Sequence, residues 1–268
     1  MKDRLSFTDW FFIFYIIFIV TTSGFLFLFF SIYIHVNDAY IIQKYYQGLL
    51  INTGICTLFL APLIPAYEKI RKVTVLPVWM LFMRKIVYGL ATGLVLLYLS
   101  YLLHRYGIEF RLFELIAAFI FIYLSYLFYD LTRGIEGPAW QHYSARIDYW
   151  LNWLLAGSAI ALVTLELGFF FHFICVLLVL GLLNLIFRIH IFNTVSSESR
   201  GIIRRLLIQY KTLFALRIII GTFIPLVLCF QFYFLNGSHS VFMAVCVLTG
   251  IILDLFLLIR SSEINSNY

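Results

Sequence analysis

Long apolar runs, separated by short polar segments, make up most of the chain. They cover residues 10–34, 47–66, 86–103, 112–129, 149–166, 168–188, 212–235 and 241–259. Most of them approach the roughly 20 residues that a helix needs to cross a hydrocarbon core of about 30 Å. The pattern predicts an all-α integral membrane protein with eight transmembrane helices.

The fifth and sixth runs are separated only by Glu166, Leu167 and Gly168. A single helix of about 40 apolar residues would far exceed one bilayer thickness, so a very tight turn is the favoured interpretation. We expect two four-helix bundles, with spans 1–4 in residues 1–133 and spans 5–8 in residues 134–268. Glycines within the spans predict close approaches between helices, at Gly24, Gly54, Gly89, Gly93, Gly157, Gly181, Gly221 and Gly250.

The composition supports a membrane location. The chain of 268 residues is 63% apolar and only 12% charged, whereas soluble domains average about 25% charged residues. The longest loops, near 67–85, 130–148 and 189–211, are too short for an independent core. Any soluble redox or catalytic domain must therefore belong to a separate chain.

Lysine and arginine are distributed unevenly across the predicted topology. With eight spans, 15 of the 19 fall on the side that holds both termini and the 2–3, 4–5 and 6–7 loops. Lys44, Arg105 and Arg111 fall on the other side, and Arg217 lies within a span. Because short cytoplasmic loops are enriched in Lys and Arg, we expect a multi-pass protein of the cytoplasmic (inner) membrane with both termini in the cytoplasm.

The sequence contains no set of residues typical of a metal or cofactor site. The four cysteines are scattered through apolar runs without a CxxC pair, so we expect no iron–sulfur cluster in this chain. Only His172 lies within a span, which disfavours a bis-histidine haem. The GxGxxG, Walker A, HExxH and GxSxG motifs are all absent from the sequence. We therefore expect no cofactor bound by this chain, no metal site, no catalytic residue and no nucleic-acid partner.

Two of the charged residues inside predicted spans stand out by their depth. Arg217 is six residues past Lys211 in span 7, and Asp254 is six residues before Arg260 in span 8. At 1.5 Å rise per residue, both lie about 9 Å into the bilayer from the cytoplasmic side. Charges at this depth are costly unless they are paired. The equal depth on adjacent helices predicts an intramembrane ion pair, for which a structural role is favoured over catalysis.

Several tracts resemble the membrane anchor subunit of dimethyl sulfoxide reductase. They are Tyr129, Pro138 and Trp140, the tract from Tyr149 to Gly157, and the run from Leu213 to Gly221 followed by Pro225. The resemblance covers the second half of the chain, and the first half only by span count. It implies an anchor that docks a molybdopterin catalytic subunit and an iron–sulfur subunit in anaerobic respiration, and that oxidises menaquinol.

The chain departs from this family at two motifs. Members usually carry His-Leu-Gly-x-Pro at the 2–3 loop, with the histidine implicated in quinol binding, whereas this chain reads Ala61-Pro62-Leu63-Ile64-Pro65. The family's last span often contains Gly-Glu followed by Arg, but here Gly250 is followed by Ile251 and the nearby acid is Asp254. An anchor without a quinol site of its own is therefore an open alternative.

A quinol pocket would need aromatic walls and hydrogen-bonding groups near one interface. All five tryptophans fall at the predicted basic side, which makes that side the place to look. The imidazole of His142 titrates near neutral pH and is suited to relay a proton. The quinol-binding candidates are Tyr67, Trp79, Arg84, Trp140, His142 and Arg217.

Two other classes of protein compete with the anchor hypothesis. A small-molecule or lipid transporter without a redox role would use broken helices at mid-depth, for which Pro62, Pro65, Gly221 and Pro225 are candidate break points. An enzyme acting on lipids is the third hypothesis, although the sequence contains no evident nucleophile–base pair or metal-ligand set.

Overall fold

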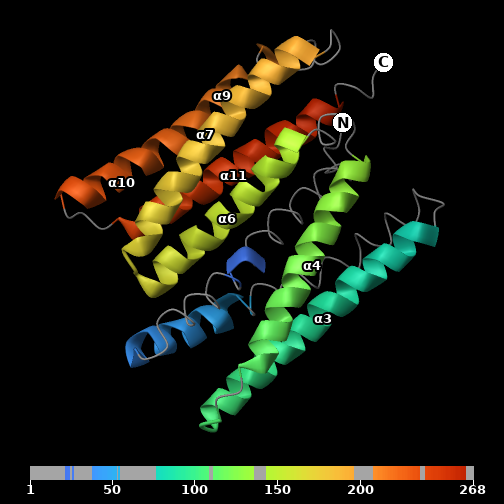
Figure 1. The fold of residues 1–268 in the computed structure, drawn as a ribbon, viewed down its shortest axis with the longest axis vertical. Helices are drawn as coiled ribbons and strands as arrows, with labels where there is room; N and C mark the ends of the chain where they lie inside the picture. Colours follow the sequence, from blue (N-terminus) through green and yellow to red (C-terminus); the bar gives the residue numbers. More distant parts are fainter. Residues whose placement is uncertain are drawn as a thin grey trace, which may run out of the picture. The chain divides into compact units, whose positions relative to one another are not determined.

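The structure is a computed structural model, and it describes residues 22–24, 26, 38–52, 54, 77–108, 111–135, 143–195, 208–235 and 239–263. Within these ranges the regular structure is entirely helical (Figure 1). Its helices are α3 (Pro77–Arg105), α4 (Leu112–Ile135), α6 (Tyr143–Leu165), α7 (Phe169–Val195), α9 (Lys211–Ile218), η1 (Ile219–Phe223), α10 (Ile224–Leu235) and α11 (Ser240–Glu263). A further helix covers residues 39–52.

Five of the described helices are long and apolar enough to cross a bilayer. They are Lys85–Arg105, Tyr143–Leu165, Phe169–His190, Lys211–Phe234 and Ser240–Leu257, which correspond to the predicted spans 3, 5, 6, 7 and 8. The segment Leu112–Leu127, in the predicted span 4, is a shorter apolar helix. Most residues of the predicted spans 1 and 2 lie outside the described ranges. The chain is therefore a multi-pass helical membrane protein, and a total of eight spans stays a prediction.

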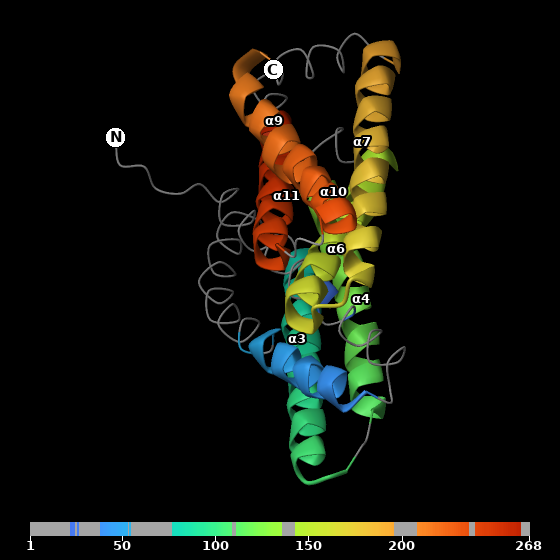
Figure 2. The same ribbon diagram turned by 90° about the vertical axis from the view of Figure 1, so that its left-hand side faces the viewer.

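The chain divides into two compact units, Met1–Phe128 and Tyr129–Tyr268. In the second unit α6 packs on α7 and on α11, while α11 also packs on α9 and η1. The helix α10 completes the bundle by contacting α7 and α11. Figures 1 and 2 show these helices running side by side.

The predicted tight turn between spans 5 and 6 is confirmed. Helix α6 ends at Leu165 and α7 begins at Phe169. Glu166 has a left-handed backbone with φ of 55°, and its N–H still donates to the Leu162 carbonyl at 3.0 Å. Helices commonly end at a residue with a left-handed backbone, which turns the chain away from the helix axis. This explains how three residues can join two spans.

Two glycines bring helices of the second unit into close contact. A Cβ built on Gly221 would lie 2.5 Å from the Cα of Gly250. In the first unit, Gly89 and Gly93 are covered by the side chains of Leu124 and Phe121. The predicted close approaches at Gly54 and Gly181 are wrong for the described residues, because nothing in them comes within 4 Å of a Cβ at either position.

The Gly221–Gly250 contact predicts a large loss of stability for Gly221→Ala. The added methyl group meets backbone, which cannot rotate away as a side chain can, so η1 and α11 must separate. Overpacking of this kind costs about 1–3 kcal/mol, and the midpoint of thermal unfolding in mild detergent should fall. Gly181→Ala is the matched control and should leave the midpoint unchanged or raise it. Equal midpoints for the two variants would contradict the backbone contact.

The left-handed backbone of Glu166 predicts an order of thermal stability among variants at that position. Glu166→Ala and Glu166→Gly both remove the side chain and its interactions, and they differ only in the Cβ. Since the left-handed region costs a residue with a Cβ about 1 kcal/mol, the glycine variant should be the more stable of the two in thermal unfolding. An alanine variant as stable as the glycine variant would argue against this turn.

Candidate functional site

The structure brings Arg217 and Asp254 together in the interior of the second unit. Arg217 Nε donates to Asp254 Oδ1 at 3.1 Å. The residues are 8% and 6% exposed, so the pair is shielded from its surroundings. A third span takes part, because Asn152 Nδ2 of α6 donates to Asp254 Oδ2 at 2.9 Å. Both oxygens of the carboxylate therefore have a donor.

A second ion pair joins α6 to α7 and was missed at the level of sequence. Arg188 pairs with Asp148, and Asn184 donates both to Asp148 Oδ1 and to the Ser144 carbonyl, the latter at 3.0 Å. A signal was present in the sequence. Asp148 and Asn152 are four residues apart, as are Asn184 and Arg188, and this spacing places each pair on one face of an apolar helix.

The two ion pairs lie toward the same end of the bundle. Asp148 follows the start of α6, and Arg188 is seven residues before the end of α7. Arg217 is six residues past the start of α9, and Asp254 precedes the end of α11. We call these four charged residues, together with Asn152 and Asn184, the polar cluster. Its formal charges cancel. Two positive and two negative side chains close together, with amides between them, suit an apolar interior.

A short π-helix follows Arg217 directly and has an identifiable cause. In an α-helix the carbonyl of Gly221 would accept from residue 225, but Pro225 has no N–H. Instead Ile224 N–H donates to the Ile219 carbonyl, five residues back. The wider turn places Thr222 on the face of Arg217, and both are buried. Single π-turns inside helices occur frequently at functional sites.

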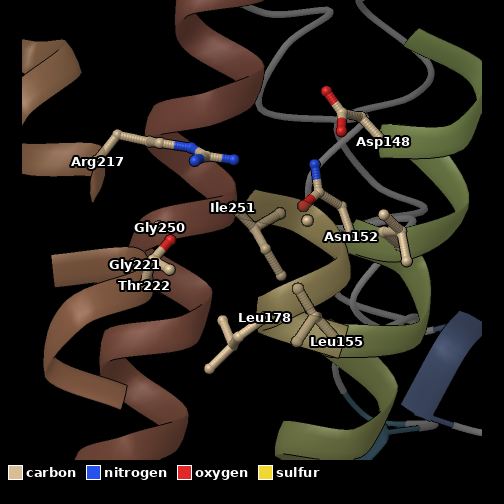
Figure 3. Close-up of a pocket in the computed structure, with 11 residues that line it drawn as sticks. Asp148, Asn152, Leu155, Leu178, Arg217, Gly221, Thr222, Gly250 and Ile251 are labelled. Carbon is tan, nitrogen blue, oxygen red and sulfur yellow. The ribbon is translucent and has the colours of Figure 1, made fainter. Parts of the chain in front are cut away.

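A small cavity of about 20 Å³ adjoins the polar cluster. Figure 3 shows Arg217 reaching toward Asp148 and Asn152 on α6. The cavity is also lined by Thr222 and by the glycines of the close contact, Gly221 and Gly250. Arg217 Nη1 is buried without a hydrogen-bond partner in the described structure. A cavity of this size has room for about one water molecule, so the cluster is suited to hold charge and one water rather than a substrate.

The predicted quinol-binding residues are not assembled by the described structure. Tyr67, Trp140 and His142 lie outside the described residues, while Trp79 and Arg84 lie on α3 with side chains outside the described part. Only the side chain of Arg217 is placed, and it belongs to the polar cluster. That these six residues form one quinol site therefore stays a prediction. Within the described ranges, no three His, Cys, Asp or Glu side chains gather as metal ligands would.

Comparison of the chain with protein-family models, with curated proteins and with solved structures gave no match.

The ion pair predicts opposite outcomes for single and double substitutions. Arg217→Leu leaves Asp254 as an uncompensated buried charge, and loss of one partner of a buried pair costs about 3–5 kcal/mol. The double variant Arg217→Leu with Asp254→Leu removes both charges and should recover most of the lost stability. Thermal unfolding in mild detergent measures both effects. Lys211→Leu, an exposed cation on the same helix, is the control and should change little. Additive losses in the double variant would contradict the pairing.

Proposed function

We propose that the chain is a membrane anchor subunit of a molybdopterin oxidoreductase of the dimethyl sulfoxide reductase type. In this role it docks a catalytic subunit and an iron–sulfur subunit at the membrane and oxidises menaquinol. The proposal places the chain in the cytoplasmic membrane with both termini in the cytoplasm. It follows from the family resemblance and from the absence of any loop long enough for a redox domain.

The observation that carries the proposal is the meeting of the resembling tracts at one carboxylate. The tract Tyr149–Gly157 supplies Asn152 from α6, and the tract Leu213–Gly221 supplies Arg217 from α9. Both donate to Asp254, the acid of the last span. Residues distant in sequence that share one buried network support a common function for these tracts. In the proposal Asp254 takes the place of the family's acid after Gly250.

The polar cluster suits an anchor better than a transporter. An anchor needs helix ends that are fixed relative to one another, because a docked subunit must hold its redox centre at a constant distance. Two ion pairs and three buried amide hydrogen bonds tie the spans of the second unit near one end. A transport path would need a polar passage, whereas the cavity beside the cluster holds about 20 Å³.

Affinity purification tests the docking role. The tagged chain is solubilised from membranes in mild detergent, and the eluate is analysed by mass spectrometry and for metals. We expect molybdenum and iron to co-elute with two soluble subunits. An unrelated tagged polytopic membrane protein from the same cells is the control. A single chain without metal would overturn the anchor assignment and favour a transporter.

Substitution of the quinol-binding candidates tests the second part of the proposal. Conservative variants of Tyr67, Trp79, Arg84, Trp140 and His142 remove hydrogen-bonding groups that a quinol would use. We expect menaquinol-linked reduction by the complex to fall by roughly tenfold or more for residues that contact the ring. Activity with an artificial electron donor to the soluble subunits should be unchanged. Full menaquinol activity in every variant would show that these residues are not the site.

A further inference from the structure

Two thiols meet where α7 and α10 pack together. Cys229 Sγ of α10 donates to the carbonyl oxygen of Phe171 on α7 at 3.5 Å. In an α-helix the same carbonyl accepts from the N–H four residues on, which here belongs to Cys175. The thiols of Cys175 and Cys229 are themselves in hydrogen-bonding contact, and both are free. Two cysteines that are distant in the sequence thus form a dithiol pair.

The aromatic contacts beside the pair fix the register of the two helices. The rings of Phe171 and Phe232 stack with centroids 4.1 Å apart and planes inclined by 6°. Cys175 lies four residues after Phe171, and Cys229 lies three residues before Phe232. On antiparallel helices these two steps lead in the same direction by about one turn. The stacked rings therefore place the two cysteines opposite each other, independently of the contact between the thiols.

The two thiols differ in their exposure. Cys229 is 1% exposed, whereas Cys175 is half-buried. A reagent from the surroundings therefore reaches Cys175 first, and Cys229 reacts through Cys175. Disulfide exchange proceeds in two such steps, by way of a mixed disulfide that a second thiol resolves. The pair thus has an outer thiol for the first step and an inner thiol for the second.

The dithiol pair lies toward the end of the bundle opposite to the polar cluster. Cys175 is six residues past the start of α7, and Cys229 is six residues before the end of α10. At 1.5 Å rise per residue, both are about 9 Å from that end. In the orientation proposed above, this end faces the extracytoplasmic side, where disulfides form and persist.

We propose that Cys175 and Cys229 are a redox modification site, which reacts with a low-molecular-weight disulfide to form an intramolecular disulfide between α7 and α10. In the first step the sulfur of Cys175 attacks the small disulfide, its S–S bond breaks, and one small thiol leaves with the proton of Cys175. In the second step Cys229 attacks Cys175 in the mixed disulfide, and the second small thiol leaves with the proton of Cys229. The protein loses two hydrogens and two electrons, and the small disulfide is reduced to two thiols.

The surroundings of the pair favour a disulfide over a metal complex. A disulfide carries no charge, so it fits an apolar span. A monovalent metal ion held by two thiolates would leave one net negative charge there, and an unpaired charge in a span is costly. Within the described ranges, no third His, Cys, Asp or Glu side chain joins the pair as a ligand.

Oxidation of the reduced full chain in lipid nanodiscs tests the proposal. The probe is 4,4′-dithiodipyridine, a small apolar disulfide whose leaving group takes up the thiol proton on its ring nitrogen. Intact mass spectrometry and peptide mapping without reductant follow the product. We expect the loss of two hydrogens, one cross-linked species that joins the peptides of Cys175 and Cys229, and its reversal by dithiothreitol. No reaction at Cys175, a lasting pyridyl adduct there, or a disulfide to another cysteine overturns the proposal.

Three variants separate the two steps. In Cys229→Ala nothing resolves the mixed disulfide, so the pyridyl adduct on Cys175 should accumulate. In Cys175→Ala the buried Cys229 should stay unmodified. Cys246→Ala removes another buried thiol, on α11, and as the control it should form the same disulfide as the unmodified sequence. Loss of the adduct in Cys229→Ala, or labelling of Cys229 in Cys175→Ala at the rate of Cys175, overturns the assignment of the steps.

The inference goes beyond the proposed function, and the two tests are independent. Oxidation is measured on the isolated chain, so it needs no molybdenum, iron or partner subunit. A chain that forms the disulfide but purifies without partners would retain the dithiol site and refute the anchor. A chain that purifies with its partners but forms no disulfide would do the opposite.

Discussion

The arrangement of the second unit depends on the cost of charge in a medium without water. An ionised side chain in hydrocarbon has no solvent to stabilise it, so it needs partners from neighbouring helices. Asp254 obtains them from α9 and α6, and Asp148 obtains them from α7. Every partner lies on another span than the carboxylate that it contacts. A shift of one of these spans past the other would therefore break a pair. The polar cluster therefore fixes the register of helices whose apolar surfaces specify it only weakly.

The contact between Gly221 and Gly250 and the π-helix belong to the same arrangement. Without side chains between them, η1 and α11 approach to backbone contact, which brings Arg217 within reach of Asp254. The missing N–H of Pro225 widens the turn that follows Arg217. The cavity beside the cluster arises where this wider turn meets α6 and α7. Close backbone packing and ion pairing thus reinforce each other, as expected where lipid gives helices no hydrophobic reason to associate.

The polar centres of the two units solve the burial of charge differently. In the second unit, carboxylates face arginines, which neutralises them permanently. In the first unit, Glu114 is surrounded by hydroxyl groups of Tyr45, Tyr46 and Ser100. Hydroxyl groups stabilise a carboxylate by hydrogen bonding and can rotate or exchange protons, whereas an arginine cannot release its proton. The carboxylates of the second unit are thus stabilised by charged donors, and Glu114 of the first unit accepts from neutral ones.

The sequence by itself determined the membrane location, the position of five apolar spans, the turn at Glu166 and the candidate partners Arg217 and Asp254. These follow from local properties, namely run length, chain reversal and the depth of a charge along one helix. The tertiary structure decided that Asn152 completes the pair, that Asp148 pairs with Arg188, and that Glu114 accepts hydrogen bonds from Tyr45 and Tyr46. Those contacts depend on the rotation and spacing of helices. Apolar residues all round a span leave that rotation undefined in the sequence, so only the packed helices reveal which faces meet.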